Sequence, residues 1–441
     1  MLPIPSVRVR IVAIVRDTMR ASMDKFRITG GNSLSGAVAI AGAKNAALPA
    51  LAACLLTDQP VVLRNLPLVR DVRTMIRVLE TLGASVDELA AAERRVTLSK
   101  VASFEAPYDL VKTMRASVLV LGPLLARYGR ARVSLPGGCA IGERPINFHI
   151  EGLSRMGAEV DLQHGYVEAR VDRLHGTEYS FPEKSVTGTE NLMMAATLAE
   201  GSTILRNCAQ EPEIIDLADM LRGMGASIRG DGTDEIVIEG RKALGEVDHR
   251  VMGDRIEAGT YLVAGALMGE NVQLRGADIE SLAPVLEQLR SCGVTIDVSE
   301  DGETLNVSRP SRLEAHDLRT SPHPGFPTDM QAQYMALMTQ AHGTSLITET
   351  IFERRFMHVG ELLRMGADIR IEGHSCVVVG PAALTAAQVM ATDLRASASL
   401  VLAALTADGV TLVHRIYHLD RGYEEMDRKL TALGADVERI R

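Results

Sequence analysis

A chain of 441 residues is too long for one ordinary hydrophobic core, so we expect two large domains or an array of repeats. Hydrophobic residues make up 46% of the chain and charged residues 23%, as in typical globular proteins. The aromatic content of 3% argues against base stacking on single-stranded nucleic acid, and the net charge of −9 argues against a general surface for nucleic acid or acidic membranes. An anionic ligand would need a local cluster of bases.

The five cysteines are odd in number and show no CxxC spacing: Cys54, Cys139, Cys208, Cys292 and Cys376. This pattern indicates neither a disulfide framework nor a zinc site, and it favours a reducing cytoplasm. His414 and His418 are four residues apart, but the segment between them is typical of a strand or turn, so we expect no metal there.

Residues 1–22 are interpreted as a dispensable extension. Their longest uninterrupted apolar run is Ile11–Val15, far too short for a signal peptide or a membrane span. A strand-like segment begins directly after Met23. We therefore expect a chain that starts at Met23 to fold and to function.

From there the sequence repeats one pattern six times. An amphipathic helix ends at a glycine, and alternating residues then begin a strand. In the first copy the apolar stripe is formed by Val72, Met75, Ile76, Leu79 and Leu82. The glycines recur at intervals of 68 to 74 residues, at Gly83, Gly157, Gly225, Gly293, Gly366 and Gly434. Such a fixed period indicates one structural unit used six times.

Each unit also contains an almost uncharged segment that predicts a buried helix followed by a strand. The six segments are 44–63, 110–135, 189–205, 255–274, 329–347 and 394–413. We expect an α/β fold of two domains, each with three repeated helix–strand–helix–strand units, with helices inside and sheets around them. The first domain is expected over 44–252 and the second over 23–43 and 253–441. The expected hinge lies near Val251–Asp254, and the ligand site lies in the cleft between the domains.

A thiol lies in the glycine- and proline-rich stretch 134–150. Gly137 and Gly138 precede Cys139, and Arg144 follows five residues later, which predicts a surface loop. A thiol on such a loop beside a guanidinium can serve as an acid or a nucleophile. From the loop alone, the alternative that Cys139 is one more small buried hydrophobe stays equally open.

Conspicuous polar residues begin the uncharged segments. They are Lys44 and Asn45 in the first, Arg115 in the second, Asp329 in the fifth and Arg395 in the sixth. Cations at helix N-termini oppose the helix dipole, so a purely structural role explains Lys44 and Arg395 poorly, although each taken singly is more often a surface charge than a ligand. Together with Arg70, Arg144 and Arg421 they indicate a shared anion site inside an acidic protein.

Six motifs closely resemble the UDP-N-acetylglucosamine enolpyruvyl transferases of bacterial peptidoglycan synthesis. They are AGAKNAALP (41–49), APYDLVKTMRAS (106–117), LPGGCAIGERP (135–145), FPTDMQAQ (326–333), MATDLRASASL (390–400) and RIYHLDRGYE (415–424). The resemblance runs from Met23 to the C-terminus and implies an inside-out α/β barrel fold. The Cys139 loop separates this family from the related enolpyruvyl-shikimate-phosphate synthases.

The resemblance implies that the 3-hydroxyl of the UDP-sugar adds to C2 of phosphoenolpyruvate, after which phosphate is eliminated. Cys139 would give the proton to C3 and form the covalent adduct, and fosfomycin-type epoxides would alkylate it. Lys44, Arg144 and Arg421 would grip the phosphate and carboxylate, and Asp329 would be the base at the sugar hydroxyl. The remaining positions matched to substrate contacts are Asn45, Arg70, Arg115, Pro145, Ile146, Asn147, Phe148, Lys184, Ser185, Val186, Ile351, Asp393 and Arg395.

Three positions depart from the common family pattern. Asn147 replaces an acid near the expected uracil pocket, Lys184 lies one place later than usual behind Glu183, and Arg70 occupies a common lysine position. Two alternatives to an active transferase of this kind are a shikimate-pathway enolpyruvyl transferase and a non-catalytic UDP-sugar sensor. The Cys139 loop disfavours the first, and the complete set of reactive residues disfavours the second.

Overall fold

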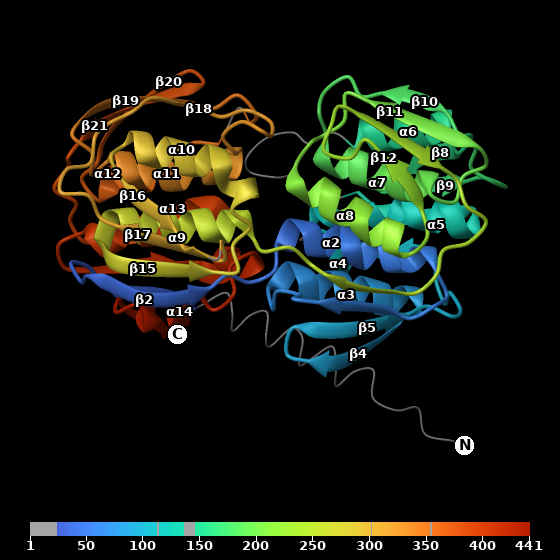
Figure 1. The fold of residues 1–441 in the computed structure, drawn as a ribbon, viewed down its shortest axis with the longest axis horizontal. Coiled ribbons are helices and arrows are strands. Elements are labelled where there is room, and N and C mark those ends of the chain that lie inside the picture. The colour runs from blue at the N-terminus through green and yellow to red at the C-terminus, as the bar shows by residue number, and fades with distance from the viewer. Residues whose placement is uncertain (1–23, 113, 136–145, 301, 353–354) are drawn as a thin grey trace.

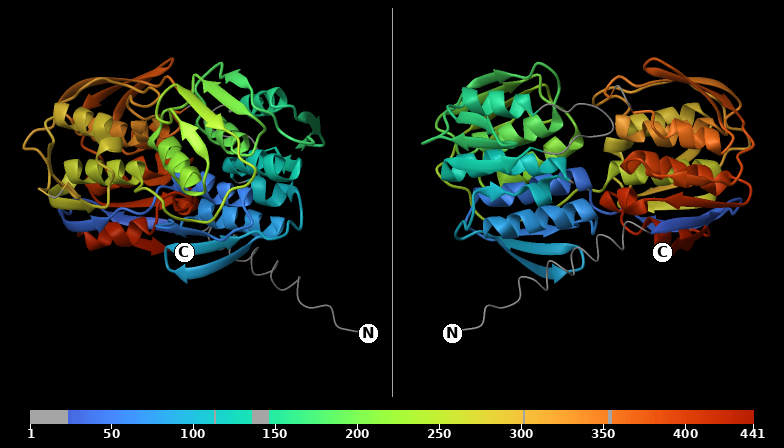
Figure 2. Two further views of the ribbon diagram at one scale, coloured as in Figure 1. Left: turned by 45° about the vertical axis from the view of Figure 1, so that its right-hand side comes forward. Right: turned by 180° about the vertical axis from the view of Figure 1, so that it is seen from behind.

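The computed structural model describes residues 24–112, 114–135, 146–300, 302–352 and 355–441. They form six four-stranded sheets, three in each of two domains, and the sheets surround buried helices (Figure 1). Two further views show the same enclosure of helices by sheets in both domains (Figure 2). Within the described ranges, no helix is long and apolar enough to cross a membrane.

The sheets of the first domain share one strand order. They are β14(Val247–Arg250)-β3(Val61–Arg64)-β5(Glu93–Thr97)-β4(Ser85–Ala90), β6(Glu105–Ala106)-β7(Arg130–Ser134)-β9(Tyr166–Arg170)-β8(Glu159–Gln163) and β10(Glu178–Ser180)-β11(Ser202–Arg206)-β13(Glu235–Glu239)-β12(Ser227–Arg229). In each, the first pair of strands is parallel and the other two pairs are antiparallel.

The second domain repeats this order with strands from both ends of the chain. Its sheets are β2(Leu34–Ala39)-β15(Gly269–Arg275)-β17(Thr304–Ser308)-β16(Thr295–Val298), β18(Leu318–Arg319)-β19(Gly343–Thr348)-β21(Ser375–Gly380)-β20(Asp368–Glu372) and β22(Gln388–Met390)-β23(Val410–His414)-β1(Lys25–Thr29)-β24(Asp436–Ile440). Because β1 and β2 pair with strands after residue 268, the N-terminal strands complete this domain.

In five of the six uncharged segments, each segment forms its own continuous buried α-helix. These helices are α2(Lys44–Ala53), α7(Val186–Ala196), α9(Arg255–Met268), α11(Gln331–Met338) and α13(Leu394–Thr406). The second segment is broken into α4(Tyr108–Val111), η2(Arg115–Val120) and α5(Leu121–Tyr128). Pro123 lies in the first turn of α5, where its missing N–H has no intrahelical partner to lose.

The six glycine junctions are confirmed. They follow α3(Arg70–Leu82), α6(Asn147–Arg155), α8(Pro212–Gly223), α10(Ala283–Ser291), α12(Val359–Arg364) and α14(Met426–Ala432). All six glycines have a left-handed backbone, with φ between 89° and 110°. In the first junction Val72, Met75, Leu79 and Leu82 of the predicted apolar stripe are buried, whereas Ile76 is only partly buried.

The two domains have separate apolar cores. One runs from Ala43 to Val251, and the other combines Phe26–Ile40 with residues from Ile256 onward. The chain crosses between them twice, and the crossings lie side by side. The Ala43 N–H donates to the Met252 carbonyl at 2.7 Å, and the Asp254 N–H donates to the Ala41 carbonyl at 2.9 Å.

The junction glycines differ in the space around them, which yields a matched pair of substitutions. An added Cβ at Gly83 would lie 2.7 Å from the Ala102 nitrogen and 2.9 Å from the Lys100 oxygen, whereas nothing lies within 4 Å at Gly225. We predict that Gly225→Ala costs only the left-handed backbone strain of about 1–2 kcal/mol. Gly83→Ala should cost clearly more, because it adds a clash with backbone. Urea unfolding of both variants tests this, and equal losses would contradict it.

Candidate active site

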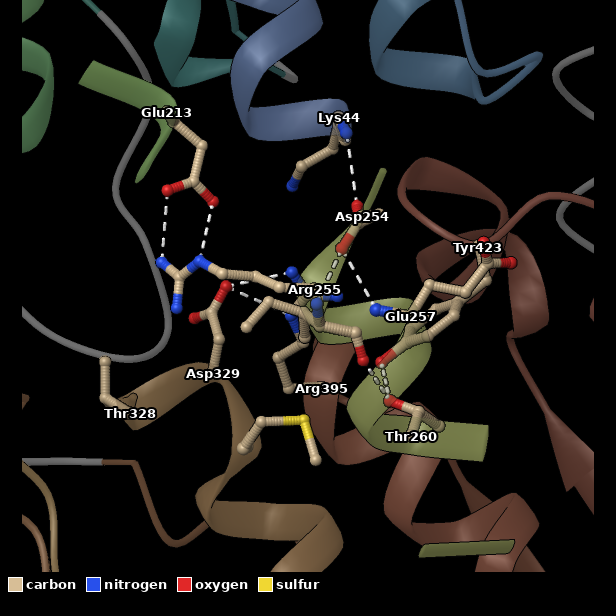
Figure 3. Close-up of polar contacts among 12 residues, drawn as sticks. Lys44, Glu213, Asp254, Arg255, Glu257, Thr260, Thr328, Asp329, Arg395 and Tyr423 are labelled. Atoms are coloured by element: carbon tan, nitrogen blue, oxygen red, sulfur yellow. Dashed lines mark hydrogen bonds and ion pairs between the residues drawn. The ribbon is translucent and has the colours of Figure 1, made fainter. Parts of the chain in front are cut away.

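One carboxylate joins the starts of two helices from opposite domains. Lys44 is the first residue of α2, and its N–H donates to Asp254 Oδ2 at 3.1 Å. Asp254 Oδ1 also accepts the N–H groups of Ile256 and Glu257, at 2.8 and 3.0 Å, at the start of α9 (Figure 3). The Asp254 side chain therefore fixes the position of Lys44 relative to the second domain.

The Lys44 side chain lies among charges and is 12% exposed. Burial lowers its pKa to about 8, with Arg395 and Arg421 acting in the same direction and Asp71 and Asp329 opposing them. Lys44 is thus mainly protonated at neutral pH and loses its charge as the pH rises through about 8. Lys44 is therefore a partly desolvated cation that can bind an anion.

Arg421 reaches the same place from the second domain. It ends η5(Ile416–Arg421), and its Nε and Nη2 donate to the two oxygens of Asp71 at 2.9 and 3.1 Å. The second of these oxygens lies 3.9 Å from Lys44 Nζ. Asp71 on α3 therefore holds one cation from each domain.

Asp329 lies between two buried arginines. It belongs to η4(Thr328–Met330), directly before α11. Arg355 Nη2 donates to its Oδ1 at 2.7 Å, and Arg395 donates to its Oδ2 from Nη2 at 2.9 Å and from Nε at 3.1 Å. Burial alone would raise the pKa of Asp329, but Arg395, Arg355 and Lys44 together hold it well below its usual value. In this arrangement Asp329 is ionised and is a weak base.

A second ion pair crosses the interface. Arg255, the first residue of α9, donates to Glu213 on α8 from Nε at 3.0 Å and from Nη2 at 3.2 Å (Figure 3). Both side chains are almost fully buried, at 8% and 3% exposure. Because each charge is removed from water, each depends on the other for its stability.

A polar group in the first domain surrounds the start of α7. Ser185 Oγ accepts the Gly188 N–H at 3.1 Å and so caps the helix, while Lys184 Nζ donates to the Cys208 carbonyl at 2.8 Å. His149 on α6 contacts Asn191 Nδ2 at 2.8 Å. Burial, assisted by Arg115, lowers the pKa of His149 to about 4, so the ring is neutral. An uncharged ring beside a capped helix N-terminus suits a polar or anionic ligand.

The reactive-thiol prediction lies outside the described residues, as do the predictions for Arg144 and Pro145. In the part of the chain that the structure describes, no group of three or more His, Cys, Asp or Glu side chains is placed to hold a metal ion.

The comparisons with known proteins agree over almost the whole chain. A family model described as EPSP synthase (3-phosphoshikimate 1-carboxyvinyltransferase) matches residues 28–430. The UDP-N-acetylglucosamine 1-carboxyvinyltransferase of Geobacter metallireducens is 55% identical over 95% of this chain and 100% of its own length. That of Koribacter versatilis is 53% identical over 95% of this chain and 97% of its own. The chain belongs to the UDP-N-acetylglucosamine 1-carboxyvinyltransferase family.

Solved structures match the fold of this carboxyvinyltransferase. The enolpyruvyl transferase NikO from Streptomyces tendae has a TM-score of 0.87 at 27% identity, covering 95% of this chain and 99% of its own. An EPSP synthase from Acinetobacter baumannii has a TM-score of 0.75 at 18% identity, covering 95% of this chain and 100% of its own, which shows the fold alone. The inside-out arrangement of helices and sheets expected for the family is confirmed.

The structure brings four of the expected site residues of this carboxyvinyltransferase together, namely Lys44, Asp329, Arg395 and Arg421. Around them, Asn45 follows Lys44 in α2, Arg70 begins α3, and Asp393 caps α13 by accepting the Arg395 N–H at 2.9 Å. The Ile351 N–H donates to Glu349 Oε1 at 2.8 Å, and Thr328 donates to the other oxygen of Glu349 at 2.9 Å.

The other expected substrate positions lie in the polar group of the first domain. Asn147 and Phe148 begin α6 directly after Ile146, and Val186 begins α7 directly after Lys184 and Ser185. Arg115 begins η2 and acts on His149.

Two residues that contact this cationic centre were not predicted from the sequence. Asp71 was not singled out, although an acid that follows Arg70 directly before the apolar stripe is a usable signal. Arg355 follows Arg354 in a segment with no periodic pattern, so nothing in the sequence distinguishes it. Only the fold places it on Asp329.

The two arginines on Asp329 lead to a prediction about stability. Asp329→Asn should cost about 3–5 kcal/mol at pH 7, because it leaves buried positive charge without its partner. Since the folded-state pKa of Asp329 is depressed, its contribution is present above the ordinary aspartate pKa and is lost as the pH falls below it. The difference between the wild type and the variant should therefore shrink in acid, as measured by urea unfolding from pH 7 to pH 3.

Asp248→Asn is the matched control. Asp248 also accepts two hydrogen bonds from one arginine, Arg64, at 2.7 and 2.8 Å, but on the exposed surface. Its loss should change stability far less, because water screens exposed pairs. Equal losses in the two variants would contradict the account of Asp329.

Proposed function

We propose that this enzyme transfers the enolpyruvyl group of phosphoenolpyruvate to the 3-hydroxyl of UDP-N-acetylglucosamine and releases phosphate. This reaction would be the first committed step of peptidoglycan synthesis in the bacterial cytoplasm, on which cell shape and division depend. The observation that carries the proposal is the cationic centre of Lys44, Arg395 and Arg421, assembled from both domains inside a chain of net charge −9. The relatives named above support the choice of substrates.

The donor carries a phosphate and a carboxylate, and the centre offers donors suited to both. Arg395 Nη1 is buried and has no hydrogen-bond partner among the described residues, although its other nitrogens bind Asp329. A buried guanidinium N–H without a partner is costly unless a ligand accepts from it. We place the donor's carboxylate at this nitrogen and its phosphate near Lys44 and Arg421, where fixed positive charge stabilises the transition state.

Binding of that carboxylate would change Asp329. The low pKa of Asp329 depends on the charges of Arg395 and Arg355. When a second carboxylate shares those charges, the pKa of Asp329 rises and the side chain becomes a better base. Asp329 would then take the proton of the sugar hydroxyl only after the donor is in place.

The acceptor would lie across the first domain. The start of α7 at Ser185 and Val186, together with Arg115 and the start of α6 at Asn147, would surround the uridine diphosphate. Lys184 is engaged with the Cys208 carbonyl here, and it would need to turn from that carbonyl to reach a phosphate.

The chemistry then proceeds in two steps. In the addition step, the hydroxyl oxygen bonds to C2, Asp329 takes the hydroxyl proton, and Cys139 gives a proton to C3. In the elimination step the Cys139 thiolate takes a proton back from C3, the bond from C2 to the phosphate oxygen breaks, and phosphate leaves with the proton that Asp329 had taken from the hydroxyl. We propose that the sugar nucleotide binds first, because its phosphates relieve repulsion among the cations and so stabilise the contact between the domains.

Phosphate release tests this function directly. We predict release that requires both substrates, with one phosphate and one enol ether formed per turnover. Mass spectrometry of the product identifies the enol ether. Release with shikimate 3-phosphate in place of the UDP-sugar would contradict the proposal, and so would binding of both substrates without release.

Labelling by fosfomycin tests the thiol. The other four cysteines are buried, and burial raises the pKa of each; for Cys208 and Cys376 it reaches about 12. We therefore predict that the epoxide alkylates Cys139 alone. Cys139→Asp should keep some activity and escape the drug, because a carboxyl can also donate a proton, whereas Cys139→Ala should be nearly inactive. Peptide mass spectrometry showing the label mainly on another cysteine would contradict the assignment.

A further inference from the structure

Asp71 is a buried carboxylate that the steps above leave without a role. Asp71 is 4% exposed, and its two carboxylate oxygens accept hydrogen bonds from Arg421. This is the bidentate geometry with which arginines bind the carboxylate or phosphate of a ligand. It also lies 3.9 Å from Lys44 Nζ. The two cations that we assign to the donor's phosphate are therefore already held by a side chain of the protein.

This contact spans the two domains. Asp71 lies on α3, whose apolar residues belong to the first core, whereas η5 packs in the second core. Close by, the Leu68 N–H donates to Glu424 Oε2 at 2.7 Å, which gives a second link between the same two segments. Asp71 thereby fixes Arg421 against the first domain, beside Lys44.

Asp71 is also the main support for the charge of Lys44. Arg395 on α13 and Arg421 on η5 disfavour that charge, and Asp329 on η4 supports it less than Asp71 does. The other elements packed against α2 carry Arg115 on η2, Glu190 on α7 and Glu213 on α8, and none of these is among the groups that act most strongly on Lys44. Without Asp71, Lys44 would face two arginines with only Asp329 to offset them.

We propose that Asp71 is a positioning residue of this site, which directs Arg421 into the interface and keeps Lys44 protonated before the donor's phosphate arrives. The inference rests on the proposed function for the identity of that donor. The effect of the Asp71 carboxylate on the charge of Lys44 and on the position of Arg421 can be measured without turnover.

The first test is the pH profile of Asp71→Asn, which keeps the shape of the side chain and removes its charge. In the wild type, kcat/KM for phosphoenolpyruvate should fall above about pH 8, as Lys44 loses its proton. In the variant this fall should move about one pH unit lower, because an opposite charge within about 4 Å has been lost. Asp71→Glu should restore most of the shift. A merely structural role would lower kcat/KM by the same factor at every pH, and that result would overturn the proposal.

Glu424→Ala is the matched control. It removes the neighbouring link between the two segments but none of the charges that act most strongly on Lys44. The control should leave the pH of the fall unchanged. An equal shift in this control would assign the effect to domain contact rather than to the carboxylate of Asp71, and would overturn the proposal.

The second test does not need activity. Acetic anhydride labels only neutral amines, so the rate of Lys44 acetylation against pH, followed by peptide mass spectrometry, gives the pKa of Lys44. The midpoint should lie near pH 8 in the wild type and lower in Asp71→Asn. If the midpoint shifts but the protein releases no phosphate, the positioning role of Asp71 is supported and the proposed function is contradicted. If turnover is normal but the midpoint does not shift, the positioning role of Asp71 is contradicted and the proposed function stands.

Discussion

Charged side chains, rather than a shared apolar core, make the contact between the two domains at this site. Asp71 binds Arg421, Glu213 binds Arg255, and each pair joins residues whose neighbours belong to different cores. Asp254 adds a third link by accepting the N–H of Lys44. Interfaces of this polar kind allow the domains to move relative to one another. The site therefore exists only while these contacts, or substrates in their place, bring the domains together.

The same charges account for the chemistry that we propose. An acidic chain concentrates Lys44, Arg395 and Arg421 at one place and offsets them with Asp71 and Asp329. Substrate anions enter this balance as additional negative charge, so binding and protonation are coupled. In particular, the basicity of Asp329 depends on how much of the charge of Arg355 and Arg395 it must share.

Much of the fold could be predicted because it repeats. The spacing of six glycines and of six uncharged segments specifies the units, and the left-handed backbone at Gly83 and its five counterparts follows from the same pattern. The break before Pro123 was not predicted, since the apolar composition of that segment continues through it. Lys44, Asp329 and Arg395 could be chosen because they lie at the start of uncharged segments, whereas the role of Arg421 was implied by the family resemblance. Arg355 stands in no sequence pattern, and Asp71 was not chosen although it follows Arg70 directly; the role of each comes from a partner more than 20 residues away.

The most direct test of the central claim is a distance measurement between the domains by double electron–electron resonance. Spin labels at Leu162→Cys on β8 and Ile371→Cys on β20 occupy exposed positions, one in each domain, in a chain with Cys139→Asp. We predict one narrow distance distribution without substrates, broadened toward longer distances by Asp71→Asn with Glu213→Gln, and narrowed again by UDP-N-acetylglucosamine with phosphoenolpyruvate. An unchanged distribution in the double variant would show that these ion pairs do not hold the domains together, and would contradict the account.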